Sequence, residues 1–298
     1  MRSGILLLDK PMGLSSNAAL QKTRRMLRAD KAGHVGSLDP LATGMLPICL
    51  GEATKIAGDI LAGRKLYRFT VALGARTATG DTEGAVVETA PVPPVNKQSL
   101  EGVLKAFHGA QTQIPPMYSA LKRDGQPLYK LARAGIEVER AARPIEIFSL
   151  SLLESSASNL DLEVLCSKGT YVRTLAEDIA KALGTCGHVA SLRRVYVEPF
   201  GEMPMETLES ISGALEAGSL PNILPIDAPL QHMAAVALDL KASEKILHGQ
   251  AVHAAGYGAA GRVRLYDFAG TFMGIGESDG AGKVRPRRLF VPDASPAQ

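Results

Sequence analysis

One carboxylate stands alone in a stretch of the chain that is mostly glycine, proline and apolar residues. The stretch runs from His34 to Lys55, HVGSLDPLATGMLPICLGEATK, and Asp39 has no acidic neighbour in it before Glu52. Pro40 fixes its own φ and pushes Asp39 toward an extended backbone. A carboxylate held in this way could act as a nucleophile or a base. An isolated Asp-Pro pair would instead be a simple turn.

Two residues elsewhere in the chain could support the chemistry of such a carboxylate. Tyr67 begins a segment, residues 67–73, whose side chains alternate between two faces as in a strand. By residue type alone it is a core aromatic, although it lies at the end of the apolar face. Arg173 could form an exposed i,i+4 pair with Glu177 on a helix, or it could grip a nearby carboxylate with two bonds and lower its pKa. Both interpretations stay open for each residue.

The composition is that of a globular protein with little net charge. The chain has 298 residues, 46% hydrophobic and 21% charged, and a net charge of +3. These values exclude a disordered chain and give only weak support for a polyanionic partner. Basic residues nevertheless gather in three clusters, which could follow a phosphate backbone or form ordinary solvated surface. The clusters are Lys22, Arg24, Arg25, Arg28 and Lys31; Arg64, Lys65 and Arg68; and Lys283, Arg285, Arg287 and Arg288.

Residues 111–143 differ from their surroundings and are typical of an excursion from a core. Prolines and a glycine open and interrupt the segment, and a short helix is expected at 128–134. Tyr118 and Tyr129 lie among its basic residues. Basic and aromatic side chains together suit phosphate contacts and base stacking, so we predict a loop that binds RNA. The basic residues expected to contact RNA are Lys122, Arg123 and Lys130.

The sequence predicts neither a metal site nor a disulfide framework. Cys49, Cys166 and Cys186 are far apart, and the six histidines have no metal-ligand spacing. The apolar run 5–8 is too short for a signal peptide, and no segment is long enough to span a bilayer. We therefore expect a cytoplasmic protein with reduced thiols.

The remaining pattern indicates an α+β catalytic domain, residues 1–230, followed by a small domain, residues 231–298. Expected strands of the first domain are 5–8, 67–73, 85–88, 145–154, 160–166 and 188–200. One expected helix begins at Ser15 or Ser16 and ends near Arg28. Two others are expected at 97–107 and 172–183. Prolines gather at 218–229 before the second domain. Short strands at 236–240, 263–268, 271–275 and 289–291, with a helix from Ser243, outline a small β-barrel there.

Five motifs occur in the order and at the spacing of a known family. They are Leu8-Asp9-Lys10-Pro11, the run 34–55 with its core Leu38-Asp39-Pro40, Lys65-Leu66-Tyr67-Arg68, the segment 113–122 and the segment 166–173. Together they resemble the TruB family of bacterial tRNA pseudouridine-55 synthases. The resemblance covers nearly the whole chain and is weaker at the C-terminus, where residues 231–298 resemble a PUA domain, which implies an RNA-binding barrel. Val35, where many members have threonine, is a small departure beside the central motif.

The resemblance implies a role for each matched residue. Asp39 is implied to be the catalytic aspartate, Tyr67 to pack against the target uracil, and Arg173 to pair with the aspartate. His34 is implied to hold the RNA where the base has left the stack. Lys10, Tyr171 and Leu192 are implied to line the substrate pocket. Asp81 matches a recurrent family aspartate but could equally be a satisfied turn residue.

The resemblance also implies a fold and an activity. The fold is a pseudouridine-synthase sheet, mixed and mainly antiparallel, with a C-terminal PUA-like β-barrel. The activity is isomerisation of the uridine at position 55 in the T loop of tRNA, with the base flipped out, without cofactor or metal. The implied partner is tRNA, with no membrane and no obligatory protein partner, and the expected state is a monomer. The alternatives are an RNA-binding or tRNA-folding protein with little catalysis, and a guide-RNA-dependent relative that modifies another RNA.

Overall fold

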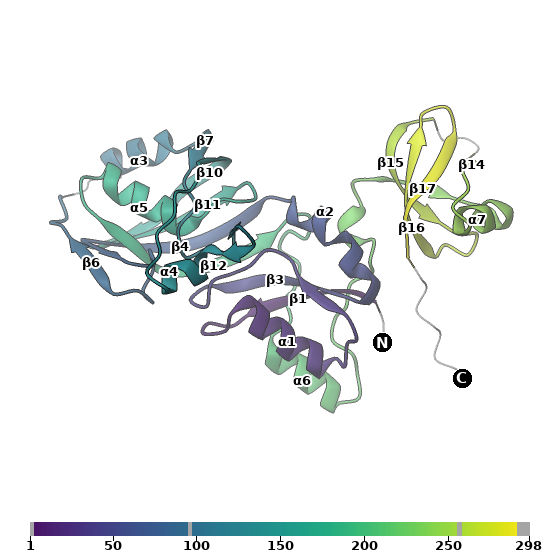
Figure 1. The fold of residues 1–298 in the computed structure, drawn as a ribbon, viewed down its shortest axis with the longest axis horizontal. Helices are drawn as coiled ribbons and strands as arrows, with labels where there is room; N and C mark the ends of the chain where they lie inside the picture. The colour runs from purple at the N-terminus through teal and green to yellow at the C-terminus, as the bar shows by residue number, and fades with distance from the viewer. Residues whose placement is uncertain (1–2, 95–96, 255–257, 291–298) are drawn as a thin grey trace.

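The computed structural model describes residues 3–94, 97–254 and 258–290, which form two separate β-sheets with helices around them (Figure 1). The first sheet has eight strands and holds most of the chain, and the second has five strands near the C-terminus. A linker with η2 (Ala228–Leu230) precedes the second sheet. The expected α+β architecture with a mainly antiparallel first sheet is therefore confirmed.

The order of the strands in the first sheet brings distant segments together. The order is β1-β3-β12-β4-β11-β10-β7, with β2 paired to β3. All neighbours are antiparallel except β12 and β3, which are parallel at Arg193 and Arg194. The strand bounds are β1 Gly4–Lys10, β2 Ala32–His34, β3 Thr43–Leu50, β4 Lys65–Leu73, β7 Gly109–Gln113, β10 Arg143–Ser155, β11 Asn159–Cys166 and β12 Gly187–Val197.

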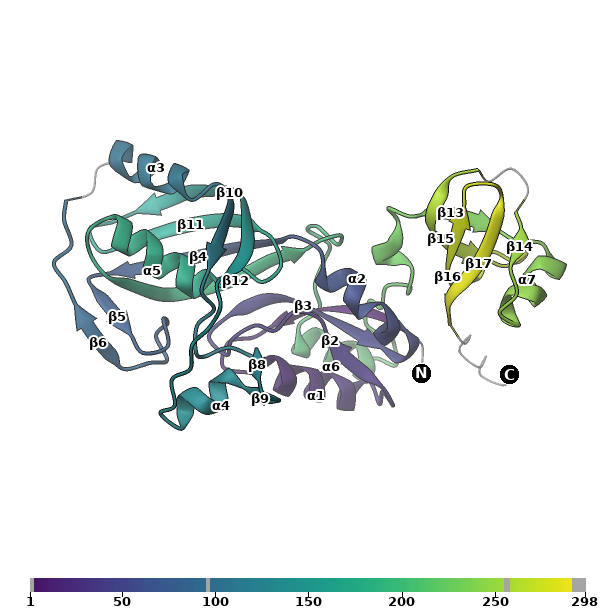
Figure 2. The same cartoon turned by 45° about the horizontal axis from the view of Figure 1, so that its top comes forward.

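Helices cover one face of each half of this sheet. In Figures 1 and 2, α3 and α5 lie over the half that contains β4, β10 and β11, and α1 and α6 lie against the half that contains β1 and β3. Alternation on β4 places Tyr67, Phe69, Val71 and Leu73 on the buried face, as the sequence predicts. The helix bounds are α1 Ser16–Met26, α3 Lys97–Ala106, α5 Val172–Ala182 and α6 Leu208–Glu216.

Several predicted element bounds in the first domain need correction. The excursion is shorter than 111–143, because Gln111–Gln113 end β7 and Arg143 begins β10. Helix α1 ends at Met26, since Arg28 has a left-handed φ of 50°. Strand β12 ends at Val197, before Pro199, which has no N–H for the sheet. Inside the excursion, a two-stranded hairpin and a short helix project from the sheet (Figure 2): β8 Lys122–Arg123, β9 Gln126–Pro127 and α4 Leu128–Arg133.

The second sheet has the order β13-β15-β16-β17-β14 and one helix. Helix α7 begins at Leu240 and not at Ser243, because the side chain of Asp239 accepts from the N–H of Ala242 and caps it. The expected strand 236–240 therefore ends at Ala237. The expected strand 289–291 was also misplaced: β17 ends at Leu289, and Val291 lies outside the described residues. The bounds are β13 Ala234–Ala237, α7 Leu240–Leu247, β14 Val252–His253, β15 Ala260–Tyr266, β16 Phe272–Asp279 and β17 Lys283–Leu289.

The second sheet docks on the short helices that follow β3. These are η1 (Gly51–Ile56) and α2 (Ala57–Leu61). Lys55 Nζ donates to the carbonyl of Leu289 at 3.0 Å, and Arg262 pairs with Asp59 at 2.6 Å. Phe290 is buried in the same hydrophobic cluster as Ile5. The division at residues 230 and 231 stays a prediction. A further hairpin, β5 (Ala75–Thr77) and β6 (Val86–Thr89), lies outside both sheets.

Gly44 is a position where the parallel pairing of β3 with β12 leaves no room for a side chain. Its φ is +99°, and a Cβ there would lie 2.1 Å from the carbonyl oxygen of Arg194. Gly44→Ala should therefore lower the free energy of unfolding by about 2–4 kcal/mol, from strain and overpacking combined. Gly58→Ala in α2 is the control, because nothing lies within 4 Å of its added Cβ. Denaturant unfolding should show the control to be unchanged or slightly more stable. Equal stability of both variants would contradict the described packing.

Candidate active site

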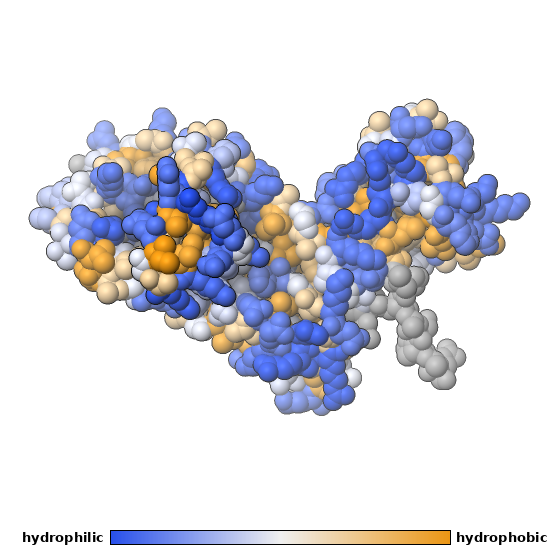
Figure 3. Space-filling model, in the orientation of Figure 1, coloured by the Kyte–Doolittle hydropathy of each residue, from blue (hydrophilic) through white to orange (hydrophobic). Residues whose placement is uncertain are grey.

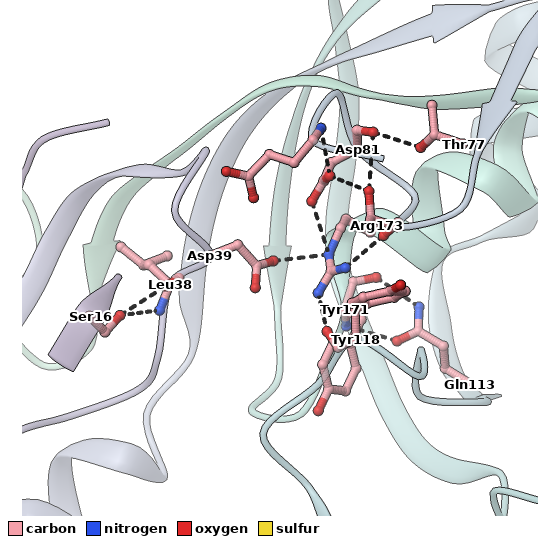
Figure 4. Close-up of polar contacts among 11 residues, drawn as sticks. Ser16, Leu38, Asp39, Thr77, Asp81, Gln113, Tyr118, Tyr171 and Arg173 are labelled. Carbon is pink, nitrogen blue, oxygen red and sulfur yellow. Dashed lines mark hydrogen bonds and ion pairs between the residues drawn. The ribbon is translucent and has the colours of Figure 1, made fainter. Parts of the chain in front are cut away.

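A tight loop between β2 and β3 presents Asp39. The carbonyl of Asp39 accepts from the N–H of Ala42 at 3.0 Å, which closes the turn that the Asp-Pro pair begins. The hydroxyl of Ser16 holds the preceding residue, since it donates to the carbonyl of Leu38 at 2.9 Å and accepts from the Leu38 N–H at 2.7 Å (Figure 4). The N–H of Gly13 donates to the carbonyl of Pro40 at 2.8 Å. The loop is thus fixed from α1 and from the turn after β1.

Arg173, at the first turn of α5, meets this carboxylate. Its Nε lies 2.9 Å from Oδ2 of Asp39 and 3.8 Å from Oδ2 of Asp81. Its two terminal nitrogens donate to the carbonyls of Thr79 and Tyr118, each at 2.6 Å. The guanidinium is almost fully buried, so its orientation is determined by these four groups (Figure 4). The exposed pair with Glu177 is therefore not the arrangement that forms.

Asp81 braces the arginine from the far side. The residue is 2% exposed, and its Oδ1 accepts from the hydroxyl of Thr79 at 2.5 Å and from the N–H of Glu83 at 3.0 Å. The interpretation of Asp81 as a satisfied turn residue is therefore right for its Oδ1, while its Oδ2 faces Arg173. From the sequence alone, the turn residue and the family aspartate were alternative interpretations of Asp81, and the structure combines them.

Opposing effects act on the pKa of Asp39. Desolvation raises it above its ordinary value, and the charge of Arg173 lowers it. The carboxyl group of Asp81 raises it by like-charge repulsion. The side chain of Asp39 is still 39% exposed, so it combines a desolvating environment with access from solvent. A carboxylate that is reachable and poorly hydrated suits a nucleophile or a base.

Tyr67 and Leu192 form an apolar wall on the sheet, and the charge of Asp39 acts on the Tyr67 phenol. They lie on neighbouring strands, where Tyr67 is opposite Arg194 and Leu192 is opposite Phe69, so all four side chains share one face. Tyr67 and Leu192 are each 8% exposed. Burial raises the pKa of the Tyr67 phenol. The wall is therefore largely dry at the ring of Tyr67.

Three other predicted site residues surround the loop. His34 ends β2, and burial lowers its pKa, which favours the neutral ring. Tyr171 precedes α5, and the amide of Gln113 pairs with its backbone N–H at 2.8 Å and its carbonyl at 3.1 Å. Lys10 is fully buried, and its ammonium donates to the carbonyls of Pro11, Leu14 and Pro40. Burial lowers the pKa of Lys10 to about 8. Among these contacts, the bond from Lys10 to the carbonyl of Pro40 reaches the Asp39 loop directly. The roles of Lys10, His34 and Tyr171 in binding substrate stay predictions.

Comparison with known proteins places this geometry in a family. Residues 24–172 match the model of the TruB family pseudouridylate synthase N-terminal domain. Residues 173–231 match the tRNA pseudouridylate synthase B C-terminal domain, and residues 234–290 match the pseudouridine synthase II TruB C-terminal model. The chain belongs to the TruB family of pseudouridine synthases. The resemblance carried by the five motifs is thereby confirmed.

Individual relatives are similar over almost their whole length. The chain is 52% identical to the tRNA pseudouridine synthase B of Aromatoleum aromaticum, over 99% of this chain and 95% of the relative. It is 50% identical to the protein of the same name from Stutzerimonas stutzeri, over 97% and 95%. Among solved structures, a chain in the crystal structure of a Cbf5-Nop10-Gar1 complex aligns with a TM-score of 0.72 and 25% identity, over 97% of this chain and 85% of that chain.

The structure separates the basic clusters by how their charges are used. Arg64 and Arg68 pair with Glu198 and Glu163, each at 2.8 Å. Near the C-terminus, Glu277 accepts from both Arg285 and Arg287, and Arg288 donates to the carbonyl of Lys55. The cluster on and just after α1, called the α1 cluster below, is different: Lys22, Arg25, Arg28 and Lys31 are exposed, and no ion pair engages them among the described residues.

Two further features concern binding surfaces. Lys122 and Arg123 on β8 and Lys130 on α4 are exposed on the projecting segment, and their contact with RNA stays a prediction. Blue, hydrophilic side chains cover much of the lobe that contains α1 and α6 (Figure 3). Over the described part of the chain, no helix is long and apolar enough to cross a membrane.

One residue of the site escaped the sequence analysis. Arg194 is 1% exposed, and its Nη1 lies 3.5 Å from the hydroxyl of Tyr67. The expected strand 188–200 carried a signal, since Arg194 follows Leu192 by two residues and so shares its face. An arginine on an inward face is uncommon and marks a position worth testing.

Removing the charge of Arg173 should raise the pKa of Asp39 further. The guanidinium favours the carboxylate, so in Arg173→Met burial and Asp81 act on Asp39 without that opposition. Carbon-13 NMR titration of labelled aspartates, assigned with Asp39→Asn, would measure the shift. Arg68→Met, which removes an exposed arginine paired with Glu163, should leave Asp39 unchanged. An unchanged or lower pKa in Arg173→Met would refute the electrostatic role of this ion pair.

Proposed function

We propose that this protein isomerises the uridine at position 55, in the T loop of tRNA, to pseudouridine. One observation carries the proposal: the solvent-reachable Asp39 meets the buried Arg173 at 2.9 Å, beside the wall formed by Tyr67 and Leu192. Relatives about 50% identical over nearly the whole chain are named tRNA pseudouridine synthase B, which supports tRNA as the substrate.

The reaction exchanges one bond of the uracil for another. The bond from N1 to the ribose breaks, the base turns in the pocket, and C5 forms the new bond to the same carbon. Asp39 either attacks the sugar, attacks the base, or assists departure of the base and removes a sugar proton. Every route needs the carboxylate form of Asp39, which Arg173 favours. No atoms are added or lost and nothing is oxidised, so the chemistry requires no redox cofactor.

The target base must leave its stack to reach Asp39. Flipping costs roughly a few kcal/mol, which contacts to the extruded base and to the RNA must offset. Tyr67 and Leu192 offer an apolar surface for the uracil, and His34 lies at the entrance to the catalytic loop, on the strand before it. Tyr171 precedes the helix that carries Arg173 and completes the proposed pocket.

We assign the binding of the RNA backbone to surfaces away from the pocket. The exposed cations of the α1 cluster border an open surface depression of about 380 Å³ lined by Gln21, Arg24, Arg25, Arg28, Ala29 and Asp30. The projecting segment adds Lys122, Arg123 and Lys130. We infer that these two surfaces contact phosphates, and that in the C-terminal sheet the charge of Glu277 offsets part of the charge of Arg285 and Arg287.

The two alternative functions are a tRNA-folding protein and a guide-RNA-dependent enzyme. A tRNA-folding protein with little catalysis would not need Asp39 and Arg173 arranged as an ion pair. A guide-RNA-dependent enzyme would modify another RNA, whereas the relatives about 50% identical to this chain are named for tRNA. Both comparisons favour an enzyme that acts on tRNA directly. We further infer that the protein acts in the cytoplasm, as a monomer and without an obligatory protein partner.

Asp39→Asn should abolish turnover while tRNA affinity stays within a few-fold of the wild type. The amide keeps the size of the side chain and loses the anion that every route requires. Purified protein would be incubated with unmodified tRNA, and pseudouridine would be mapped by position in the product. Binding by the variant would be measured separately, to show that the pocket and the grip persist. Product at position 55 from Asp39→Asn, or wild-type product only at another position, would sink the proposal.

Neutralising the unpaired cations should make tRNA binding less sensitive to salt. Each lost phosphate contact reduces the log–log slope of affinity against salt by roughly 0.9 on duplex and less on single strands. The test variant changes Arg25, Arg28, Lys122 and Lys130 to glutamine. The matched control changes Arg285 and Arg287, which both pair with Glu277. Affinity measured at four salt concentrations should show a shallower slope for the first variant. A larger change in the control would place the grip at the C-terminal sheet.

A further inference from the structure

A second arginine, Arg194 of β12, lies beneath the candidate site and is nearly sealed from solvent. It is 1% exposed. Within residues 3–94, 97–254 and 258–290, no carboxylate forms an ion pair with it, in contrast to Arg173 and to its own neighbour Arg193, which pairs with Asp9. Burying an unpaired cation costs free energy, so a fold retains one only where its contacts are used.

The guanidinium of Arg194 holds both ends of the catalytic loop. Its Nε donates to the carbonyl of Met45 at 2.7 Å, and its Nη2 donates to the carbonyl of Gly36 at 2.8 Å. Gly36 precedes Asp39 by three residues, and Met45 follows it by six. One side chain therefore ties the strand after the loop and the chain before it to β12. The loop can shift relative to the sheet only if these buried bonds break.

The third guanidinium nitrogen of Arg194, Nη1, lies beside Tyr67. Nη1 is 3.5 Å from the phenol oxygen, which is long for a hydrogen bond but close for a charge in a dry environment. Tyr67 and Arg194 are directly opposite each other on β4 and β12, so the approach is imposed by the register of the sheet. Burial raises the pKa of Tyr67, and the charge of Arg194 opposes that rise.

We propose that Arg194 is a positioning residue that locks the Asp39 loop to the sheet and holds the oxygen of Tyr67 ready to accept the C5 proton of the rotated base. The inference rests on the proposed function, because it concerns the last step of that reaction. Its distinguishing claim is that Arg194 acts on two groups at once, the loop through Gly36 and Met45 and the base through Tyr67.

The proton step balances without an additional reagent. After C5 has bonded to the ribose carbon, it still carries its hydrogen. Tyr67 first gives its phenol proton to water, which leaves the phenolate as the base. The C5–H bond then breaks, the proton passes to the phenolate oxygen of Tyr67, and the electron pair forms the C5–C6 double bond. The former N1–C6 double bond opens, and N1 takes a proton from water. A cation beside the phenol favours the phenolate and so favours the acceptor.

An isotope substitution distinguishes this role from simple support of the fold. RNA with 5-deuterouridine at the target slows only the step that breaks the C5–H bond. Single-turnover rates would be measured with protiated and deuterated RNA for wild type, Arg194→Gln and Arg194→Lys. Arg194→Gln should be slower by about 100-fold and should show a larger isotope effect than wild type. Arg194→Lys, which keeps the charge, should recover part of the rate and reduce the isotope effect.

Matched variants keep the outcome interpretable. Arg193→Gln removes the adjacent arginine, which pairs with Asp9 on the other face, and should leave the isotope effect unchanged. In a Tyr67→Phe background, Arg194→Gln should slow single turnover less than it does when Tyr67 is present, because the phenol that Arg194 acts on is missing. If Arg194→Gln does not fold, Arg194→Lys still carries the test, because it cannot bond both carbonyls and face Tyr67 together.

Each of four outcomes decides the question. A slow Arg194 variant with an enlarged isotope effect supports the inference. A slow variant whose isotope effect equals that of wild type overturns it and leaves Arg194 as support for the loop alone. A variant with the wild-type rate also overturns it. Absence of pseudouridine from the wild-type protein would overturn the proposed function itself, independently of any Arg194 variant.

Discussion

The ion pair between Asp39 and Arg173 is the constraint on which the rest of this structure depends. Its two halves come from segments more than a hundred residues apart, a loop between β2 and β3 and the first turn of α5. They meet because β12 and β4 join the two halves of the sheet, and β12 pairs with β3 in parallel at Arg193 and Arg194. The mixed sheet therefore brings the isolated carboxylate Asp39 next to Arg173.

The position of Arg173 on its helix has an electrostatic cost that explains the second aspartate. A cation in the first turn opposes the helix dipole, whose positive end lies there. Asp39 and Asp81 place two carboxylates at that end, which offsets both the dipole and the burial of the guanidinium. The carbonyls of Thr79 and Tyr118 take the remaining donors. Asp81 therefore contributes to the state of Asp39 through the arginine that they share.

Local signals in the sequence predicted the elements better than the contacts between them. Alternation on residues 67–73 and the apolar stripe of residues 172–183 predicted β4 and α5, because each pattern reports burial of its own residues. Strands β3 and β17 were missed or misplaced, since β3 is buried on both faces and shows no alternation, and charges mask β17. Arg194 was missed because its role depends on the register between β4 and β12, which no local pattern specifies.

The sequence likewise showed where basic residues gather but not which of them are paired with acidic residues. Counting basic residues gave three comparable clusters, yet Glu277, Glu198 and Glu163 already pair with members of two of them. Such exposed pairs add little stability, but they reduce the field that a polyanion meets. The α1 cluster and the projecting segment keep their cations unpaired or weakly paired over the described residues, and in the C-terminal cluster the exposed Lys283 forms no ion pair there either. A chain with a net charge of +3 can therefore present a directional positive surface, because its acidic residues cancel charge at some clusters and spare it at others.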